Sequence, residues 1–298
     1  MSGCHNSNND NPFSHLVKKH PCYNGQAHSK YGRIHLPVSP SCNIQCKFCR
    51  RGFNKYEKRP GVSRGIMTPE EALKNVSKAL NLCPEITVVG IAGPGDTLAS
   101  DRAIETFRLI HAEFPELIKC LSTNGLLLEE KAKRLVEVGV KTVTVTVNAV
   151  DTEIVQKVCS HIIYQGQVFT GSAAACGLLL AQLKGIKRAA SLGMIIKVNA
   201  VLIPGVNDEH IGQIARVTAS AGAVLMNVIP LIPQNQMEHL RPPSCEELNQ
   251  ARSTAEAYLP VFRHCQQCRA DACGIPGSGI DLAGILYDDH PVQTFSHG

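Results

Sequence analysis

Hydrophobic and polar positions alternate along the chain with two different periods, which predict strands and helices in turn. Six stretches rich in β-branched residues predict buried strands, at residues 34–38, 85–91, 117–122, 141–148, 194–201 and 223–229. The predicted helices begin at or near Thr68, Asp101, Leu128, Asp151, Ala174, Asn207 and Ser244, with a looser stretch before Ala174. Such alternation predicts a parallel sheet covered by helices, in six strand–helix units. A doubly wound sheet would also fit, but no Gly-x-Gly-x-x-Gly follows the first strand.

Alternation inside the strands predicts which side chains face the interior. In residues 141–148, three valines alternate with threonines and an asparagine, so one face can pack against helices while the polar face lines the interior. By the same count the interior side should hold His35, Cys120, Ser122, Lys197 and Asn199. The sequence thus predicts one lumen that contains a thiol, an imidazole, hydroxyls and amides.

The first strand leads into three closely spaced cysteines, Cys42, Cys46 and Cys49, with Phe48 just before the last. A cubane iron–sulfur cluster normally takes four cysteines, so three at this spacing would leave one iron open for chemistry. A zinc knuckle or three unrelated thiols is the plainer alternative, but the spacing, the aromatic residue and the place after a strand favour the cluster. This loop resembles that of the radical S-adenosylmethionine (SAM) superfamily, in which the open iron binds the amino and carboxylate groups of SAM. Reductive cleavage there yields methionine and a 5′-deoxyadenosyl radical.

The resemblance implies the fold class and the division of the chain. It implies an α/β fold, a partial (β/α)6 TIM-like barrel at residues 31–262, with extensions at residues 1–30 and 263–298. The active site of such barrels lies at the carboxyl ends of the strands. Ordinary turns would explain any one of the motifs found there, but they explain all of them together poorly.

Two groups of residues at these strand ends are candidates for SAM binding. Gly93, Pro94, Gly95 and Asp96 resemble the superfamily motif whose backbone holds the SAM amino group. Candidates for the carboxylate, ribose and adenine are Ser122, Asn124, Asn148 and Asn199, with Phe48 beside the adenine.

A late Cys-x2-Cys pair, Cys265 and Cys268, is followed by Cys273. A zinc site or a redox pair would fit, but beside a radical SAM loop an auxiliary iron–sulfur cluster is the better interpretation. A closer resemblance is carried by several motifs together: His20-Pro-Cys22, Arg33-Ile-His35, the cysteine loop, Glu57-Lys-Arg-Pro-Gly-Val62, Ala92-Gly-Pro-Gly-Asp96, Ser122-Thr-Asn-Gly125 and the late cysteine pair. From about His20 to Arg269 the chain resembles the NifB family of nitrogenase cofactor maturases, in its short form without an additional carboxyl-terminal domain.

This resemblance implies an unusual reaction. Two [4Fe-4S] substrate clusters are fused with a carbon from SAM and one more sulfur into an eight-iron, carbide-centred precursor. One SAM gives a methyl group to a cluster sulfide, and a second gives the radical that abstracts hydrogen from that methyl. The implied partners are an Fe-S cluster donor protein, an electron donor such as ferredoxin, and nitrogenase cofactor scaffold or carrier proteins.

The same resemblance implies a role for each of the matching residues. Cys42, Cys46 and Cys49 would hold the SAM cluster, Cys22, His35 and Cys120 one substrate cluster, and Cys265 and Cys268 part of the other. Glu57 and Arg59 could order the site or move protons, or form a surface ion pair of little worth. Cys273 is a candidate further ligand, Cys4 is expected to be incidental, and the cysteines expected to be buried as small apolar residues are Cys83, Cys159, Cys176 and Cys245.

The composition of the chain indicates its cellular compartment and the kinds of partner that it can bind. The 298 residues are 44% apolar, with 13 cysteines and no tryptophan. An odd cysteine count and a polar start without a leader favour a reducing, cytoplasmic setting, and we expect no membrane span. The net charge is +5, and the basic residues crowd after the cysteine loop, where they could be solvated or could neutralise anionic clusters. Nucleic acid is the least favoured partner. Two other functions fit the residues: a radical SAM enzyme with auxiliary clusters that modifies a peptide or small molecule, and a non-catalytic iron–sulfur scaffold or carrier.

Overall fold

Six parallel strands form one curled sheet in the computed structural model, which describes residues 14–287. They are β1 (Gly32–His35), β5 (Ile86–Ile91), β6 (Ile118–Thr123), β7 (Val140–Thr146), β10 (Ile195–Leu202) and β11 (Leu225–Pro230). Each is hydrogen-bonded to the next in chain order, and a short antiparallel strand, β12 (Cys273–Gly274), is added beside β1. A doubly wound sheet would reverse its order at a switch point, so this order confirms the predicted partial barrel.

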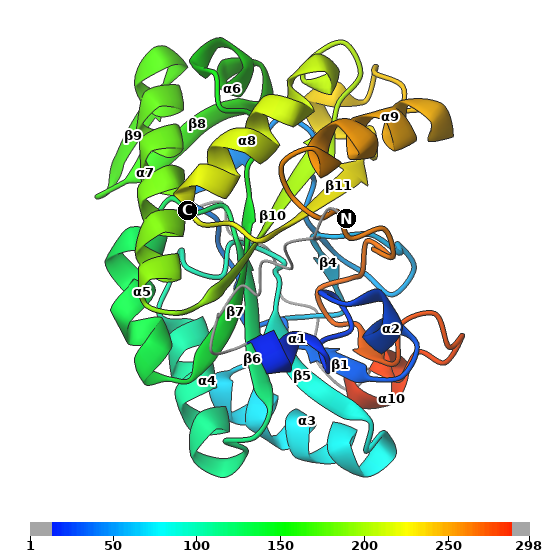
Figure 1. Cartoon of the computed structure of the whole chain (residues 1–298). Coiled ribbons are helices and arrows are strands. Elements are labelled where there is room, and N and C mark those ends of the chain that lie inside the picture. Colours follow the sequence, from blue (N-terminus) through cyan, green and yellow to red (C-terminus); the bar gives the residue numbers. More distant parts are fainter. Residues whose placement is uncertain (1–13, 288–298) are drawn as a thin grey trace, which may run out of the picture.

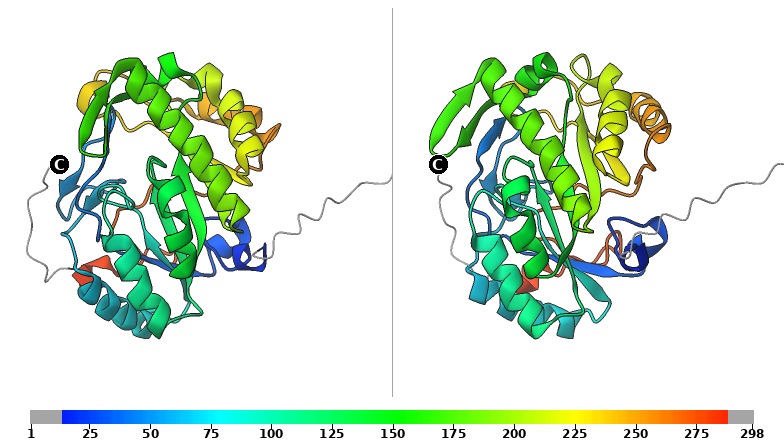
Figure 2. Two further views of the ribbon diagram at one scale, coloured as in Figure 1. Left: turned by 90° about the vertical axis from the view of Figure 1, so that its left-hand side faces the viewer. Right: turned by 60° about the vertical axis from the view of Figure 1, so that its left-hand side comes forward.

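Helices cover the outer side of the curled sheet (Figures 1 and 2). They are α3 (Pro69–Leu82), α4 (Arg102–Glu113), α5 (Leu128–Glu137), α6 (Thr152–Val158), α7 (Gly171–Ser191), α8 (Ile211–Ala221) and α9 (Cys245–Glu256). Capping boxes start α3 at Thr68 and α9 at Ser244, and the Asp151 side chain caps α6, because these oxygens accept otherwise unpaired N–H groups. Shorter helices are α1 (Ser14–Val17), α2 (Gly25–His28) and α10 (Ala283–Tyr287), with 3-10 turns at η1 (Asp208–His210) and η2 (Asn235–Met237).

The main core lies between the sheet and these helices. Val143, Val145 and Val147 are fully buried in it, which confirms the alternation predicted for β7. Burying a valine side chain contributes about 1.5 to 3 kcal/mol, so this face fixes the register of the strand. The polar residues between them turn to the concave side.

The first predicted strand differs most in its bounds, whereas the ends of the other five differ by at most two residues. The chain was expected to be a strand over residues 34–38, but β1 starts at Gly32 and ends at His35. Pro37 has no N–H to continue the ladder. Leu36 and Val38 are nevertheless fully buried.

A β-hairpin, β8 (Cys159–Tyr164) and β9 (Gln167–Thr170), replaces the looser stretch predicted before α7. Its turn places Gln165 and Gly166 at positive φ, which suits a tight hairpin. Strand β8 also pairs with β2 (Ile44–Cys46), so the middle of the cysteine loop is itself a strand. A parallel pair, β3 (Gly52–Phe53) and β4 (Val62–Ser63), follows the loop.

Two cysteines depart from the prediction. Cys83 and Cys159 are buried as expected, but Cys176 and Cys245 are exposed. Cys176 lies on the solvent side of α7, and Cys245 is the first residue of α9. Cys4 lies outside the described residues. Within residues 14–287, no helix combines the length and apolar character needed to cross a membrane.

Candidate active site

A cavity of ≈ 370 Å³ opens inside the curve of the sheet and at the carboxyl ends of its strands. Most of the candidate residues line it: Cys22, His35, Cys42, Cys46, Phe48, Cys49, Arg59, Pro94, Gly95, Asp96, Cys120, Ser122, Asn124, Asn148, Asn199, Cys265 and Cys268. Gly93 and Glu57 lie outside the lining. The fold therefore brings residues together that span almost the whole chain.

The three loop cysteines lie on one side of this cavity. Gln45 holds the turn between them, because its Nε2 donates to the carbonyls of Cys46 at 2.9 Å and Cys49 at 3.2 Å. Burial raises the pKa of Cys42 to about 12 and also raises that of the other two. Buried thiols of this kind are neutral on their own and give up protons to a metal that binds them. Three thiols facing one cavity fit the donor set of a [4Fe-4S] cluster with one open iron.

The Gly-Pro-Gly-Asp segment packs directly against the entry to the cysteine loop. Gly95 N donates to Ser39 O at 2.8 Å, and Asp96 N donates to Ser41 O at 2.8 Å. A Cβ on Gly95 would lie 2.0 Å from Ser41 O, so only glycine fits here. These contacts fix the backbone just before Cys42.

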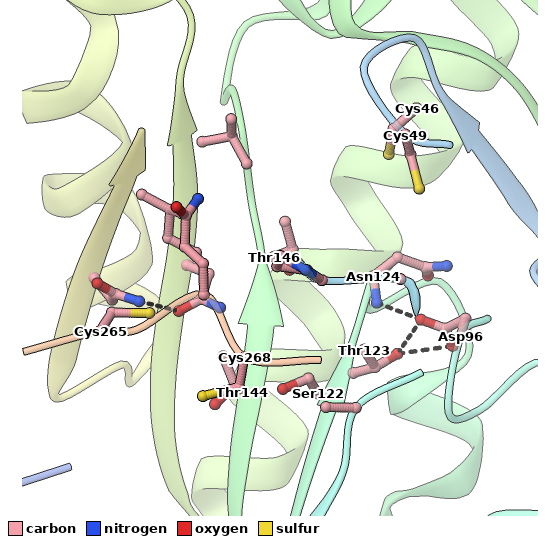
Figure 3. Close-up of a pocket in the computed structure, with 18 of the residues that line it drawn as sticks. Cys46, Cys49, Asp96, Ser122, Thr123, Asn124, Thr144, Thr146, Cys265 and Cys268 are labelled. Carbon is pink, nitrogen blue, oxygen red and sulfur yellow. Dashed lines mark hydrogen bonds between the residues drawn. The ribbon is translucent and has the colours of Figure 1, made fainter. Parts of the chain in front are cut away.

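Asp96 links the same segment to the loop after β6 (Figure 3). Its buried carboxylate accepts the Thr123 hydroxyl at 3.0 Å and the Asn124 backbone N–H at 2.6 Å. Asn124 in turn donates from its side chain to Asn43 Oδ1 at 2.7 Å. Both side chains are thus engaged within the protein, and direct contact of Asn124 with SAM stays a prediction.

The other two predicted asparagines have partners too. Asn148 Oδ1 accepts the Val201 N–H at 2.8 Å, and Asn199 Oδ1 accepts from Asn227 at 3.2 Å. Asn227 Oδ1 is buried without a hydrogen-bond partner in the described structure. Asn199 and Asn227 are paired within β10 and β11, Asn148 follows β7, and all three line the cavity.

His35 and Cys120 lie on two strands with β5 between them. Gly90 is in register with both, and a Cβ there would lie 3.0 Å from His35 Cδ2, so the absence of a side chain makes room for the imidazole. His35 Nδ1 lies 3.1 Å from the Arg269 carbonyl and therefore carries the proton, which leaves Nε2 with its lone pair. Burial and the nearby Arg33 charge lower the pKa of His35 to about 4. Cys22, between α1 and α2, also lines the cavity.

Cys265 and Cys268 lie on the opposite side from Cys46 and Cys49 in Figure 3. Arg33 Nη2 donates to Cys268 Sγ at 3.1 Å. Cys273 is buried in β12 and does not line the cavity. Within residues 14–287, no three His, Cys, Asp or Glu side chains close around a single point as a one-ion site requires.

The two residues predicted to order the site or move protons differ in placement. Arg59 is buried and lines the cavity, whereas Glu57 is exposed and outside the lining. They form an ion pair, and Arg59 also donates to the carbonyl of Arg50. Arg59 therefore shapes the segment that follows Cys49.

One buried residue that holds the site together was not selected from the sequence. Gln182 of α7 donates to the carbonyls of Asn124 at 2.8 Å and Thr146 at 3.0 Å. The sequence feature that could have identified Gln182 is a polar side chain within an otherwise apolar stretch of the helix.

Comparisons with known proteins agree with this geometry. Residues 36–217 match the family model described as the radical SAM superfamily. A protein of Methanocaldococcus infernus named FeMo cofactor biosynthesis protein NifB is 49% identical over 265 residues, covering 88% of this chain and 87% of that protein. A Klebsiella pneumoniae protein of the same name is 41% identical, covering 87% of this chain and 57% of that protein. A solved radical SAM methyltransferase from Sphaerobacter thermophilus has the same fold, with a TM-score of 0.55, 18% identity, and coverage of 77% of this chain and 65% of that one.

Proposed function

Because this chain belongs to the NifB family of radical SAM enzymes of FeMo cofactor biosynthesis, we propose that it builds the cofactor precursor from iron–sulfur clusters and SAM. Two [4Fe-4S] substrate clusters are fused with a SAM-derived carbide and one added sulfur into an eight-iron product. One SAM provides the methyl group. A second provides the 5′-deoxyadenosyl radical that abstracts hydrogen from that methyl.

A single observation carries the proposal. The loop cysteines and a second set of soft ligands, Cys22, His35, Cys120, Cys265 and Cys268, line one cavity. An enzyme that modifies a peptide or small molecule would use such ligands only for auxiliary clusters that stay bound to the protein. A fusion reaction needs them, because its substrates are themselves clusters that thiolate and imidazole bind.

The residues of the chain have separable tasks in this reaction. Cys42, Cys46 and Cys49 hold the [4Fe-4S] cluster that, when bound, supplies the electron for reductive cleavage of SAM. Gly95 and Asp96 fix the loop that carries these thiols, and Gln182 fixes the backbone at Asn124 and Thr146. Ser122, Asn148, Asn199 and Phe48 face the space left for SAM. Glu57 and Arg59 order the segment after Cys49.

Incomplete anchoring of the substrates suits the reaction. His35 binds as a neutral imidazole, because its Nδ1 proton is held by the Arg269 carbonyl while Nε2 keeps its lone pair. A neutral imidazole can dissociate from an iron ion without the separation of opposite charges that dissociation of a thiolate requires. Cys22, Cys120 and His35 for one cluster, and Cys265 and Cys268 for the other, hold the substrates without four-fold thiolate ligation.

We propose three kinds of protein partner: an Fe-S cluster donor, an electron donor such as ferredoxin, and a scaffold or carrier that accepts the product. Exposed Arg50 and Lys58, close in sequence to Cys49, support an acidic redox partner at this side of the molecule. Complementary charge speeds the encounter of such proteins.

The test is anaerobic turnover of iron-loaded protein with dithionite and SAM that carries a deuterated methyl group. The proposal expects both S-adenosylhomocysteine and 5′-deoxyadenosine, with deuterium in the latter. If deoxyadenosine forms but carries no deuterium, and no S-adenosylhomocysteine is found, the chain is instead a radical enzyme that acts on a peptide or small molecule. Neither product, with all clusters intact, indicates a scaffold.

Cys42→Ala is the matched control. It should abolish both products while the ligands at Cys265 and Cys268 stay in place. Iron bound to this variant then reports cluster carriage separately from catalysis.

A further inference from the structure

Two buried cations lie in the cavity beside the predicted substrate ligands. Arg33 is 7% exposed and Lys197 is 5% exposed, and both line the cavity. Asp96 is the one carboxylate residue among the described residues of the lining, which also include Arg50, Arg51 and Arg59. The wall of the cavity is therefore strongly positive.

Neither buried cation has a carboxylate hydrogen-bond partner within residues 14–287. Arg33 donates to Gly274 O at 2.6 Å and to Cys268 Sγ at 3.1 Å, and its Nε is buried without a partner. Lys197 Nζ donates to Cys22 O at 2.9 Å and lies 4.5 Å from the centre of the Tyr23 ring. Carbonyls and an aromatic face solvate a cation, but they do not cancel its charge.

The carboxylate of Asp96 does not fill this role. It accepts hydrogen bonds from Leu98 N, Thr123 and Asn124 N, so its charge is used within the loops that pack beside the cysteine loop. Asp271, which is fully buried, pairs with Arg269 and Arg64. Buried charges in proteins are normally paired, so two cations left in this way indicate that the counter-charge belongs to a ligand.

Both charges act on the same predicted ligands. Arg33 and Lys197 each act electrostatically on Cys22 and on His35. Arg33 also contacts Cys268, so it lies between the two predicted substrate positions. The two cations therefore stand where iron–sulfur clusters and their thiolates would add negative charge.

We propose that Arg33 and Lys197 are positioning residues that bind the anionic iron–sulfur substrates by charge, a proposal that rests on the function proposed above. Their attraction does not depend on any one iron–ligand bond. Substrate clusters can therefore exchange thiolate or imidazole ligands during fusion and still be held in the cavity.

The test compares charge removal with charge retention at one position. Lys197→Met keeps an unbranched stem against Tyr23 but removes the charge, whereas Lys197→Arg keeps it. The matched control is Lys119→Met, because Lys119 is also buried in the same sheet, on β6, but donates to Phe114 O and Pro115 O outside the cavity. Arg33→Lys and Arg33→Met repeat the comparison at the second cation.

The readout is cluster retention without SAM. Each variant is loaded with iron and sulfide, and the iron content and the rate of iron release to a chelator are measured. Lys197→Met and Arg33→Met should release the substrate iron at least about fivefold faster, because a lost buried charge acts mainly on dissociation. Lys197→Arg, Arg33→Lys and Lys119→Met should stay close to wild type. The paramagnetic signal of the loop cluster and its response to SAM verify that each variant is folded.

If Lys197→Met and Arg33→Met retain iron as well as the wild type does, the proposal is overturned. An equal loss in Lys119→Met would overturn it too, because any buried lysine would then have the same effect. This measurement needs no turnover, so its failure leaves the SAM assay unaffected. If iron retention depends on these charges but the protein makes no S-adenosylhomocysteine, the proposed anion site is supported and the proposed fusion reaction is refuted.

Discussion

The carboxylate of Asp96 accepts the backbone N–H of Asn124 at 2.6 Å, and this bond joins the loops that follow β5 and β6. The Asn124 side chain continues the connection to Asn43, next to Cys42. Asp96 N bonds back to Ser41 O at 2.8 Å. Three loops at the strand ends are thus one hydrogen-bonded unit, and the cysteine loop is a part of it.

Asp96→Asn should weaken this unit. One carboxylate oxygen becomes an amide NH2, so either the Leu98 N–H, which donates to Oδ1, or the Asn124 N–H, which donates to Oδ2, loses its acceptor. A buried unpaired group costs about 1–3 kcal/mol. We expect a lower apparent unfolding midpoint and a weaker response of the loop cluster to SAM. Asp101→Asn is the control, because Asp101 is an exposed ion-pair residue worth at most about 1 kcal/mol. Equal effects in both variants would contradict the assigned role of Asp96.

Gly95→Ala should disable SAM chemistry with the rest of the fold intact. The new methyl group would lie 2.0 Å from the Ser41 carbonyl oxygen, so the segment before Cys42 must shift. We expect a loss of deoxyadenosine formation of at least about a hundredfold, as misplacement of reacting groups can cause. Gly177→Ala in α7 is the control, since its Cβ would meet Ile162 Cδ1 at 3.4 Å, an ordinary contact. Full activity in Gly95→Ala would show that this close approach is not needed.

Arg59 and Glu57 should respond differently to substitution. Arg59 is buried and donates to the Arg50 and Pro60 carbonyls, so Arg59→Lys loses the fork of donors and should reduce SAM cleavage about tenfold or more. Glu57→Gln removes only the exposed partner and should leave the rate within about twofold. The measurement is the rate of deoxyadenosine formation. A larger loss in Glu57→Gln than in Arg59→Lys would point to proton transfer by Glu57.

His210 should make stability depend on pH near neutrality. Its Nε2 accepts the Val150 N–H at 3.1 Å, and burial lowers the pKa of His210 below 6.5, so the folded state favours the neutral form. The unfolded state then binds more protons, and stability rises with pH. The contribution is complete above pH 6.5 and is lost as the pH falls through the lower folded pKa.

His210→Gln removes the titration but keeps an acceptor. The difference in unfolding free energy between wild type and this variant should change by about 0.5–1.5 kcal/mol between neutral and mildly acidic pH. Denaturant unfolding under anaerobic conditions measures it. A difference that does not vary with pH would show that folding leaves the pKa of His210 unchanged.

The sequence allowed a good prediction of the barrel because its strands are runs of β-branched residues with one apolar face. The interior side of β6, β7 and β10 followed from the same alternation, so the placement of Cys120 and Asn199 in the lumen was predictable, and both line the cavity. The motifs located the loop of Cys42, Cys46 and Cys49, which lines the cavity. These features depend on neighbours in sequence, where periodicity is informative.

Features that depend on distant partners were not found. The hairpin β8–β9 is stabilised by pairing with β2, across a separation of 115 residues between Ser160 and Gln45. The exposure of Cys176 depends on which side of α7 packs inward. The isolation of Arg33 and Lys197 from carboxylates is visible only once the strands are assembled.

Strand β12 has a consequence for the order of assembly. It pairs Cys273 and Gly274 with Ile34 and Arg33, and the bond from Arg33 to the Gly274 carbonyl spans 241 residues. A nascent chain leaves the ribosome from its N-terminus, so the first barrel strand must wait for nearly the last described residues before its edge is covered. Arg33, His35 and Cys268 reach their final places only then. The cavity that these residues line is therefore complete only after residues 273 and 274 have been synthesised and have paired with β1.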